Sequence, residues 1–299
     1  MKKRTAFLLI VVLGVGVYKF GGLFGEKGLI RSESFSFNYK DVAGLNTQNS
    51  SDLKKSVDSA LTGAEGAYGI AIKNLITNES FYLNENRLFN PGSLYKMWVM
   101  ATVYDAIDKG QLTEDQKLSQ SIAELNTQFA IPPDVAEETS GTINLTVAQA
   151  LNQMITISHN YAALLLIEQV KRSNILNFLK DHGLKDSYVG ENPQATPFEI
   201  ALFLEKLYKG ELANPENTAK MIGLLKNQQK NEKLPKYLPK DIPIAHKTGE
   251  IDFFTHDAGI VYHPKGDYII VVMSESNFPY GAEERISNIS KAVFDYFNL

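Results

Sequence analysis

The sequence predicts an α+β protein, in which an antiparallel sheet with flanking helices carries an inserted all-helical lobe. Three observations lead to this prediction. Strand-like segments occur only near the two ends of the folded region, the stretch between them has helical periodicity, and amphipathic helices open and close the region. Strands from before and after the insertion can form one sheet, which leaves a cleft between the sheet and the lobe.

The first part of the folded region predicts one helix and two strands. The helix repeats Leu or Val at every fourth position, and the strands are short apolar runs separated by a polar turn at Thr77-Asn78. The expected bounds are 52–61 for the helix, and 68–72 and 80–83 for the strands.

The middle of the region, from residue 93 to about 225, is mainly helical in pattern. Three of its helices begin at an N-capping threonine or end near a glycine, and their expected bounds are 93–108, 146–157 and 196–209. A fourth, at 160–171, carries an apolar block over 162–167. Strands then return at 242–248, 258–262 and 268–274, and an amphipathic helix follows at 283–297.

The chain has 30 basic and 34 acidic residues, a net charge of −4 and no cysteine. Without a Lys/Arg-rich block, this charge argues against nucleic acid as a partner. The lack of cysteine excludes disulfides, thiol nucleophiles and Cys-based metal sites. The histidines have no metal-ligand spacing, so we expect neither a metal nor a cofactor. Any chemistry must use hydroxyls, amines, carboxylates or imidazoles.

Residues 1–25 have the layout of a signal peptide or signal anchor. The basic residues Lys2, Lys3 and Arg4 precede an apolar stretch over 6–18. This stretch is shorter than the roughly 20 residues of a spanning helix. Because no A-x-A cleavage site follows, we favour an uncleaved anchor over a cleaved peptide.

Residues 26–50 are polar without periodicity and are expected to form a linker. The remaining 51–299 would then be one folded domain, with its helical lobe at about 93–232. The basic N-terminus predicts that this domain is exported, either on the outer face of the cytoplasmic membrane or secreted. We expect it to be a monomer.

The first chemical motif is Ser-x-x-Lys, at Ser93 and Lys96. Lys96 is the only formal charge between Arg87 and Asp105, and a buried lysine that loses its proton is a general base. Ser93 precedes it on the same helix face, at an N-terminus that stabilises negative charge. These features predict an activated serine nucleophile. The alternative is a helix-capping serine with a snorkelling lysine.

The second motif is Ser158-His159-Asn160, at the junction of two expected helices. A serine hydroxyl there can relay a proton, and the asparagine amide can hold a lysine and bind a substrate amide. The alternative is a helix cap or a turn.

The third motif is Lys247-Thr248-Gly249, on the strand that contains Pro243. Proline predicts an edge strand, and an edge strand accepts a peptide-like substrate by β-addition. Lys and Thr can bind a carboxylate, and Gly lets a substrate approach the backbone. The alternative is an exposed edge with a protective lysine.

In this order, the three motifs resemble the signature of the serine β-lactamase and penicillin-binding protein superfamily, which is Ser-x-x-Lys, Ser-Asp-Asn and Lys-Thr-Gly. The resemblance covers roughly residues 52–299, and the order of expected elements is similar to that of class A β-lactamases. It implies a β-lactamase/transpeptidase-like fold. It also implies acyl transfer through an ester on Ser93, from a β-lactam or a D-Ala-D-Ala cell-wall peptide.

The resemblance further implies catalytic roles for four residues. Ser93 would be the acylated nucleophile, and Lys96 would be its base. Ser158 would pass a proton to the leaving nitrogen. Asn160 would contact both Lys96 and the substrate amide.

The substrate-binding residues implied by the resemblance lie on the third motif. Lys247 and Thr248 would bind the substrate carboxylate, with Gly249 beside them. The backbone N–H groups of Ser93 and Glu250 would form the oxyanion hole.

One departure from class A concerns the carboxylate that removes the acyl group. Class A carries it in a Glu-x-x-x-Asn segment on an omega loop, for which the interval 183–195 is too short. Glu199 is instead assigned to a capping box with Thr196. Glu191 is expected to be a solvated loop carboxylate, with a part in deacylation as the alternative. Leu164 stands where class A has the Asn that ties down this loop.

Acylation therefore has all its groups, whereas hydrolysis of the ester lacks its usual base, worth about 10²–10⁴-fold. We expect a serine hydrolase with fast acylation by penicillin and slow release, as in a D,D-peptidase or penicillin-binding protein. The alternatives are a β-lactamase with a non-standard base, a penicillin-sensing or cell-wall-binding module, and a structural protein with accidental motifs. His256 is expected to be a polar strand-end residue, or else to help bind the substrate carboxylate.

Overall fold

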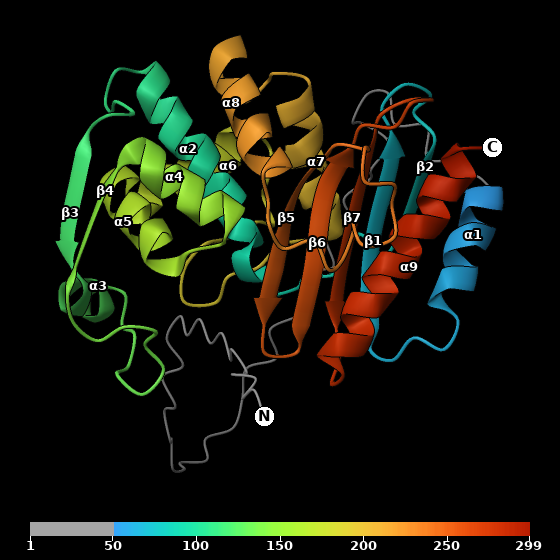
Figure 1. Cartoon of the computed structure of the whole chain (residues 1–299), viewed down its shortest axis with the longest axis horizontal. Helices are drawn as coiled ribbons and strands as arrows, with labels where there is room; N and C mark the ends of the chain where they lie inside the picture. Colours follow the sequence, from blue (N-terminus) through green and yellow to red (C-terminus); the bar gives the residue numbers. More distant parts are fainter. Residues whose placement is uncertain (1–50) are drawn as a thin grey trace, which may run out of the picture.

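The computed structural model describes residues 51–299 (Figure 1). The predicted signal segment and linker therefore lie outside the described residues. Within the described range, no helix has the length and apolar character needed to cross a membrane. The expected fold class is confirmed, because a five-stranded antiparallel sheet carries helices on both faces and has a helical lobe beside it.

The sheet joins strands from both ends of the folded region. Its order is β2-β1-β7-β6-β5, and all neighbouring strands are antiparallel. The strands are β1 Ala67–Asn74, β2 Ser80–Leu83, β5 Ile244–Ile251, β6 Phe254–Val261 and β7 Tyr268–Glu275. β5 lies at the edge, as Pro243 predicts, so its outer side faces the lobe and not another strand.

The central strands bury both faces, and successive side chains enter two different cores. Ile70 and Ile72 of β1 pack under helices α1 (Ser51–Leu61) and α9 (Pro279–Phe297), which lie against each other on one face (Figure 1). Ala71 belongs to the larger core on the other face, together with α7 (Pro197–Tyr208) and the lobe. This larger core continues from the sheet into the lobe and holds the two together.

The lobe contains most of the remaining helices: α2 Lys96–Asp108, α3 Ile122–Gln128, α4 Val147–Thr156, α5 Asn160–Val170, α6 Arg172–Asp181 and α8 Pro215–Lys226. The prediction of an all-helical lobe needs one correction. Strands β3 (Lys117–Ser121) and β4 (Thr142–Thr146) form a small antiparallel sheet at its outer end. Each strand is short and largely polar, and its partner is distant in sequence, so local periodicity does not reveal the pair.

Candidate active site

The three motifs come from three elements that meet at one place between the sheet and the lobe. Ser93 lies in the 3-10 helix η2 (Gly92–Tyr95), which runs directly into α2. Ser158 lies in the tight connection between α4 and α5. Lys247 lies on the edge strand β5 and donates to Ser158 Oγ over 3.0 Å, while Lys96 Nζ lies 3.2 Å from the same oxygen. The structure thus brings the three motifs together around one hydroxyl.

Lys96 is completely buried and has only neutral hydrogen-bond acceptors. Its Nζ donates over 2.6 Å to the carbonyl oxygen of Ser158 and over 2.6 Å to Oδ1 of Asn160. Burial lowers the pKa of Lys96 well below its ordinary value, and the nearby Lys247 and Lys230 lower it further. In a 3-10 turn, residues i and i+3 are eclipsed, so this amine follows Ser93 on the same side. The amine is therefore suited to accept a proton.

Ser158 has a strained backbone that directs two acceptors toward the same lysine. Its φ is +61°, a left-handed conformation that a serine rarely adopts. Both its carbonyl oxygen and its hydroxyl lie within hydrogen-bond distance of Lys96 Nζ. A hydroxyl oxygen accepts up to two hydrogen bonds, so Ser158 Oγ can serve Lys96 and Lys247 at once. Strain of this kind is concentrated at functional sites.

Lys247 is also completely buried, and its pKa lies at about 7. Burial is the main cause, and Lys230 adds to it, whereas the carboxylates of Asp257 and Glu250 partly oppose the shift. Lys247 Nζ donates to Ser158 Oγ and, over 2.9 Å, to the carbonyl oxygen of Thr248. A lysine with this pKa changes charge near neutral pH, which matters for any anionic ligand.

Two glycines let the turn before Ser93 contact the end of β5. Gly92 has a φ of +49°, and a Cβ there would lie 2.7 Å from the backbone nitrogen of Glu250. A Cβ on Gly249 would lie 2.4 Å from the carbonyl oxygen of Pro91. The Gly of the third motif is thus required by contact with the nucleophile turn. This contact keeps the backbone of Glu250 beside that turn.

The expectation that His256 lies at a strand end is wrong, because it is completely buried within β6. Its Nδ1 accepts the backbone N–H of Ser274 over 3.1 Å, so the ring proton is on Nε2, which donates to the carbonyl oxygen of Asn90 over 2.7 Å. Burial lowers the pKa of His256 to about 4. The neutral ring ties the sheet to the loop that precedes Ser93.

The side chain of Glu250 forms an ion-pair cluster that the sequence analysis missed. Its carboxylate pairs with Lys233, which is almost completely buried, and lies 3.5 Å from Lys230. Burial alone would raise the pKa of Glu250, but Lys233 and Lys230 lower it to about 2. The sequence analysis considered only the backbone N–H of Glu250. The lysines belong to a loop without periodicity, so nothing in the sequence connects them to this carboxylate.

Of the two hydrogen bonds in the capping box predicted for Thr196 and Glu199, only one forms. The prediction for the Glu199 side chain was wrong. Thr196 Oγ1 does accept the backbone N–H of Glu199 over 3.2 Å. However, the carboxylate accepts the backbone N–H of Asp186 over 2.9 Å and the hydroxyl of Ser187 over 2.7 Å. The carboxylate of Glu199 therefore holds the 183–195 interval in place. Asp186 and Ser187 together offer this carboxylate two donors, whereas the backbone of the N-cap residue offers one.

Glu191 is exposed at the tip of a tight turn in which Tyr188 and Gln194 exchange two backbone hydrogen bonds. Within the described residues, neither Glu191 nor Glu199 hydrogen-bonds to Lys96 or Asn160. A different carboxylate does hydrogen-bond to Asn160. Asn160 Nδ2 donates over 2.7 Å to Oε1 of Glu137, in the loop between α3 and β4. No local pattern in that loop marks Glu137.

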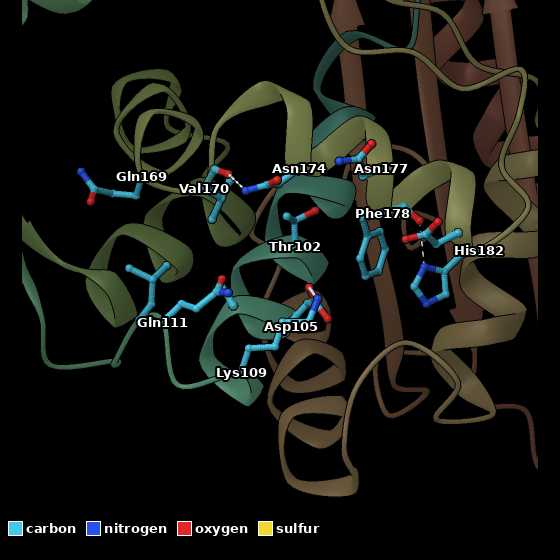
Figure 2. A pocket seen from close by; sticks show the side chains of 13 residues that line it. Thr102, Asp105, Lys109, Gln111, Gln169, Val170, Asn174, Asn177, Phe178 and His182 are labelled. Carbon is cyan, nitrogen blue, oxygen red and sulfur yellow. Dashed lines mark hydrogen bonds and ion pairs between the residues drawn. The ribbon is translucent and has the colours of Figure 1, made fainter.

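A cavity of about 340 Å³ lies beside the C-terminal half of α2 (Figure 2). Side chains from α2, α5 and α6 line it, among them Thr102, Asp105, Asn174 and His182. None of the predicted site residues lines this cavity. It is therefore separate from the place where the three motifs meet.

The chain belongs to the β-lactamase enzyme family, whose model matches residues 52–297. The fold and the site thus define a serine hydrolase of this family. Among curated proteins, the chain is 24% identical to β-lactamase VEB-1 of Pseudomonas aeruginosa, over 82% of this chain and 90% of the relative. It is 22% identical to the extended-spectrum β-lactamase PER-1 of the same organism, over 74% of this chain and 78% of the relative.

Solved structures show the same fold. The chain is similar to PBP-A with a TM-score of 0.74 and 22% identity, over 84% of this chain and 97% of that one. It is also similar to a β-lactamase from Sphaerobacter thermophilus, with a TM-score of 0.73 and 25% identity, over 83% of this chain and 97% of that one. The resemblance stated from the three motifs is confirmed.

Proposed function

We propose that this chain forms an acyl-enzyme on Ser93, with β-lactams or with D-Ala-D-Ala cell-wall peptides, and releases the acyl group slowly. The observation that carries the proposal is the environment of Lys96. This lysine is buried, has a lowered pKa, and is hydrogen-bonded only to neutral acceptors one turn after the serine. A neutral amine in that position can take the hydroxyl proton of Ser93 as the serine attacks a carbonyl carbon.

The proton must then reach the nitrogen that leaves. Ser158 Oγ lies within hydrogen-bond distance of both Lys96 and Lys247, so it can give its proton to the leaving nitrogen and be reprotonated by Lys96. The protonated Lys247 would favour this transfer by holding the hydroxyl in place. Asn160 would keep Lys96 positioned through Oδ1 and would offer an Nδ2–H to the substrate amide.

Charge that develops on the carbonyl oxygen needs donors that are already in place. The backbone N–H groups of Ser93 and Glu250 are the proposed pair, supported by the close contact of Gly92 with Glu250. Lys247 and Thr248, next to Gly249 on the edge strand, would bind the substrate carboxylate. No step of this scheme requires a metal or a cofactor.

Slow release is supported by the two carboxylates that the sequence analysis considered for the second step. Hydrolysis of the ester needs an activated water, yet Glu191 is exposed in its turn and Glu199 is engaged with Asp186 and Ser187. The comparisons include β-lactamases, and a PBP-A variant that was solved as an acyl-enzyme complex with penicillin G. They support acylation, whereas the engagement of the two carboxylates supports the slow second step.

Trapping with a fluorescent penicillin tests the proposal. We expect rapid labelling of the wild type, a label that persists for many minutes, and no labelling of Ser93→Ala. Intact mass measured over time would show one acyl group per chain. Loss of the label within seconds would overturn slow release and favour a β-lactamase with another base. Absence of labelling would overturn the acyl-enzyme itself.

We further propose that the domain works outside the cytoplasm, held at the membrane by the N-terminal segment, where cell-wall peptides are present. Membrane fractionation of cells that express the full chain tests this, since an anchored protein stays in the membrane pellet. Release into the medium would contradict the anchor.

A further inference from the structure

Glu137 lies at the point where the acyl part of a substrate would enter the site. Its Oε1 accepts a hydrogen bond from Asn160 Nδ2 over 2.7 Å, while Asn160 Oδ1 accepts one from Lys96 over 2.6 Å. In the proposed function, the same Nδ2 binds the amide carbonyl on the acyl side of the substrate. A bound substrate therefore meets the carboxylate of Glu137 at its amide group.

The position of Glu137 is held by contacts that the backbone of the next residue makes with two buried side chains. The carbonyl oxygen of the next residue, Glu138, accepts from Asn126 Nδ2 over 2.7 Å and lies 2.6 Å from the hydroxyl of Tyr161. The backbone N–H of Glu138 donates to that same hydroxyl over 3.2 Å. Tyr161 and Asn126 are both buried, and Tyr161 directly follows Asn160 in α5. One helix thus anchors the loop and contacts the carboxylate.

Among the described residues, no salt bridge involves the carboxylate of Glu137. Within residues 51–299, Glu137 has a hydrogen bond with a neutral amide and no ion-pair partner. The nearby ring of His159 is neutral, because its Nδ1 accepts the backbone N–H of Ala162 and burial lowers its pKa. The glutamate side chain is exposed, so it is accessible to a ligand.

We infer that Glu137 determines specificity by favouring acyl donors that carry an ammonium group next to the acyl amide. When the substrate carbonyl takes over the hydrogen bond from Asn160 Nδ2, the released carboxylate can pair with that ammonium group. An anionic group at the same position would be repelled. This inference rests on the proposed function and names the substrate class of the same site. Exposed ion pairs of this kind change a rate or affinity by about two- to fivefold.

Three penicillins that differ at one carbon provide the test. Next to the acyl amide, ampicillin carries an ammonium group, benzylpenicillin a hydrogen and carbenicillin a carboxylate. We expect second-order acylation rate constants of the full chain to fall in that order, with about tenfold between the two charged compounds. The difference should shrink as salt is added, because exposed charges are screened.

Two variants separate Glu137 from general surface charge. Glu137→Gln should bring the three rate constants together. Glu138→Gln removes the same charge one residue away, where only the backbone takes part in anchoring, and should keep the order. Equal rates in the wild type, an order that survives in Glu137→Gln, or an equal loss in both variants would each overturn the inference. Absence of acylation by all three compounds would overturn the proposed function and this inference with it.

Discussion

Lys96 and Lys233 are almost equally buried, yet their pKa values move in opposite directions. Lys96 contacts only neutral oxygens of Ser158 and Asn160, and its pKa falls well below the ordinary value. Burial alone would lower the pKa of Lys233 too, but the carboxylates of Glu250 and Asp257 raise it. The chemistry of the partners, and not burial, decides which lysine keeps its proton.

This difference separates two tasks. A lysine among neutral acceptors loses its proton readily and can act as a base. A lysine paired with a carboxylate stays charged and holds the chain in place, here joining the 230–233 loop to the end of β5. Lys247 lies between these extremes, with a pKa of about 7, because Asp257 and Glu250 oppose the effect of its burial only in part.

The strongest test of this difference removes the amine of Lys96, which has only neutral hydrogen-bond partners. Lys96→Met keeps a similar length but has no base, so we expect acylation by penicillin to fall about 10²–10⁴-fold. The rate of labelling by fluorescent penicillin measures this. Lys109→Met, directly after the end of the same helix, removes an exposed lysine and should leave the rate unchanged. A decrease of less than tenfold in Lys96→Met, in a protein with an unchanged melting temperature, would contradict the assignment.

The rule that burial among neutral partners opposes charge applies to His256 as well. Its folded-state pKa of about 4 lies below the ordinary 6.5, so the unfolded chain binds a proton first as the pH falls. Stability from this group is complete above pH 6.5 and is lost as the pH falls toward 4, by about 3 kcal/mol. Urea unfolding at several pH values measures the loss.

His256→Gln supplies the matched control for this pH dependence. A glutamine does not titrate, so the variant should lose less stability than the wild type between pH 6.5 and 4, even though it starts from a lower value. The same slope in both proteins would show that other groups cause the acid sensitivity.

The smallest expected effect concerns the lysine that has acidic partners. Glu250→Gln leaves Lys233 without its main counter-ion, and we expect a loss of about 1.5–3 kcal/mol in the free energy of unfolding. Lys230→Met removes a more exposed member of the same cluster and should cost less than 1 kcal/mol. Equal effects of the two variants would indicate that the cluster is held mainly by other contacts.

Much of the fold and of the site was predictable because the signals are local. The order of strands and helices follows from periodicity, and Pro243 marks the edge strand correctly. The Ser-x-x-Lys pair lies within one turn, so its spacing already constrains its geometry. By contrast, the β3–β4 pair depends on segments that are distant in sequence and short, and no periodicity distinguishes them.

The sequence by itself determined which chemical groups the chain possesses, the order of its three motifs and the class of fold that presents them. Only the tertiary structure decided the state and surroundings of those groups. It buried Lys96 among neutral oxygens, engaged the carboxylate of Glu199 with a loop, and brought Glu137 to Asn160. The physical reason is that a pKa and a hydrogen-bond partner depend on every atom within a few ångströms, and most of those atoms come from distant parts of the chain.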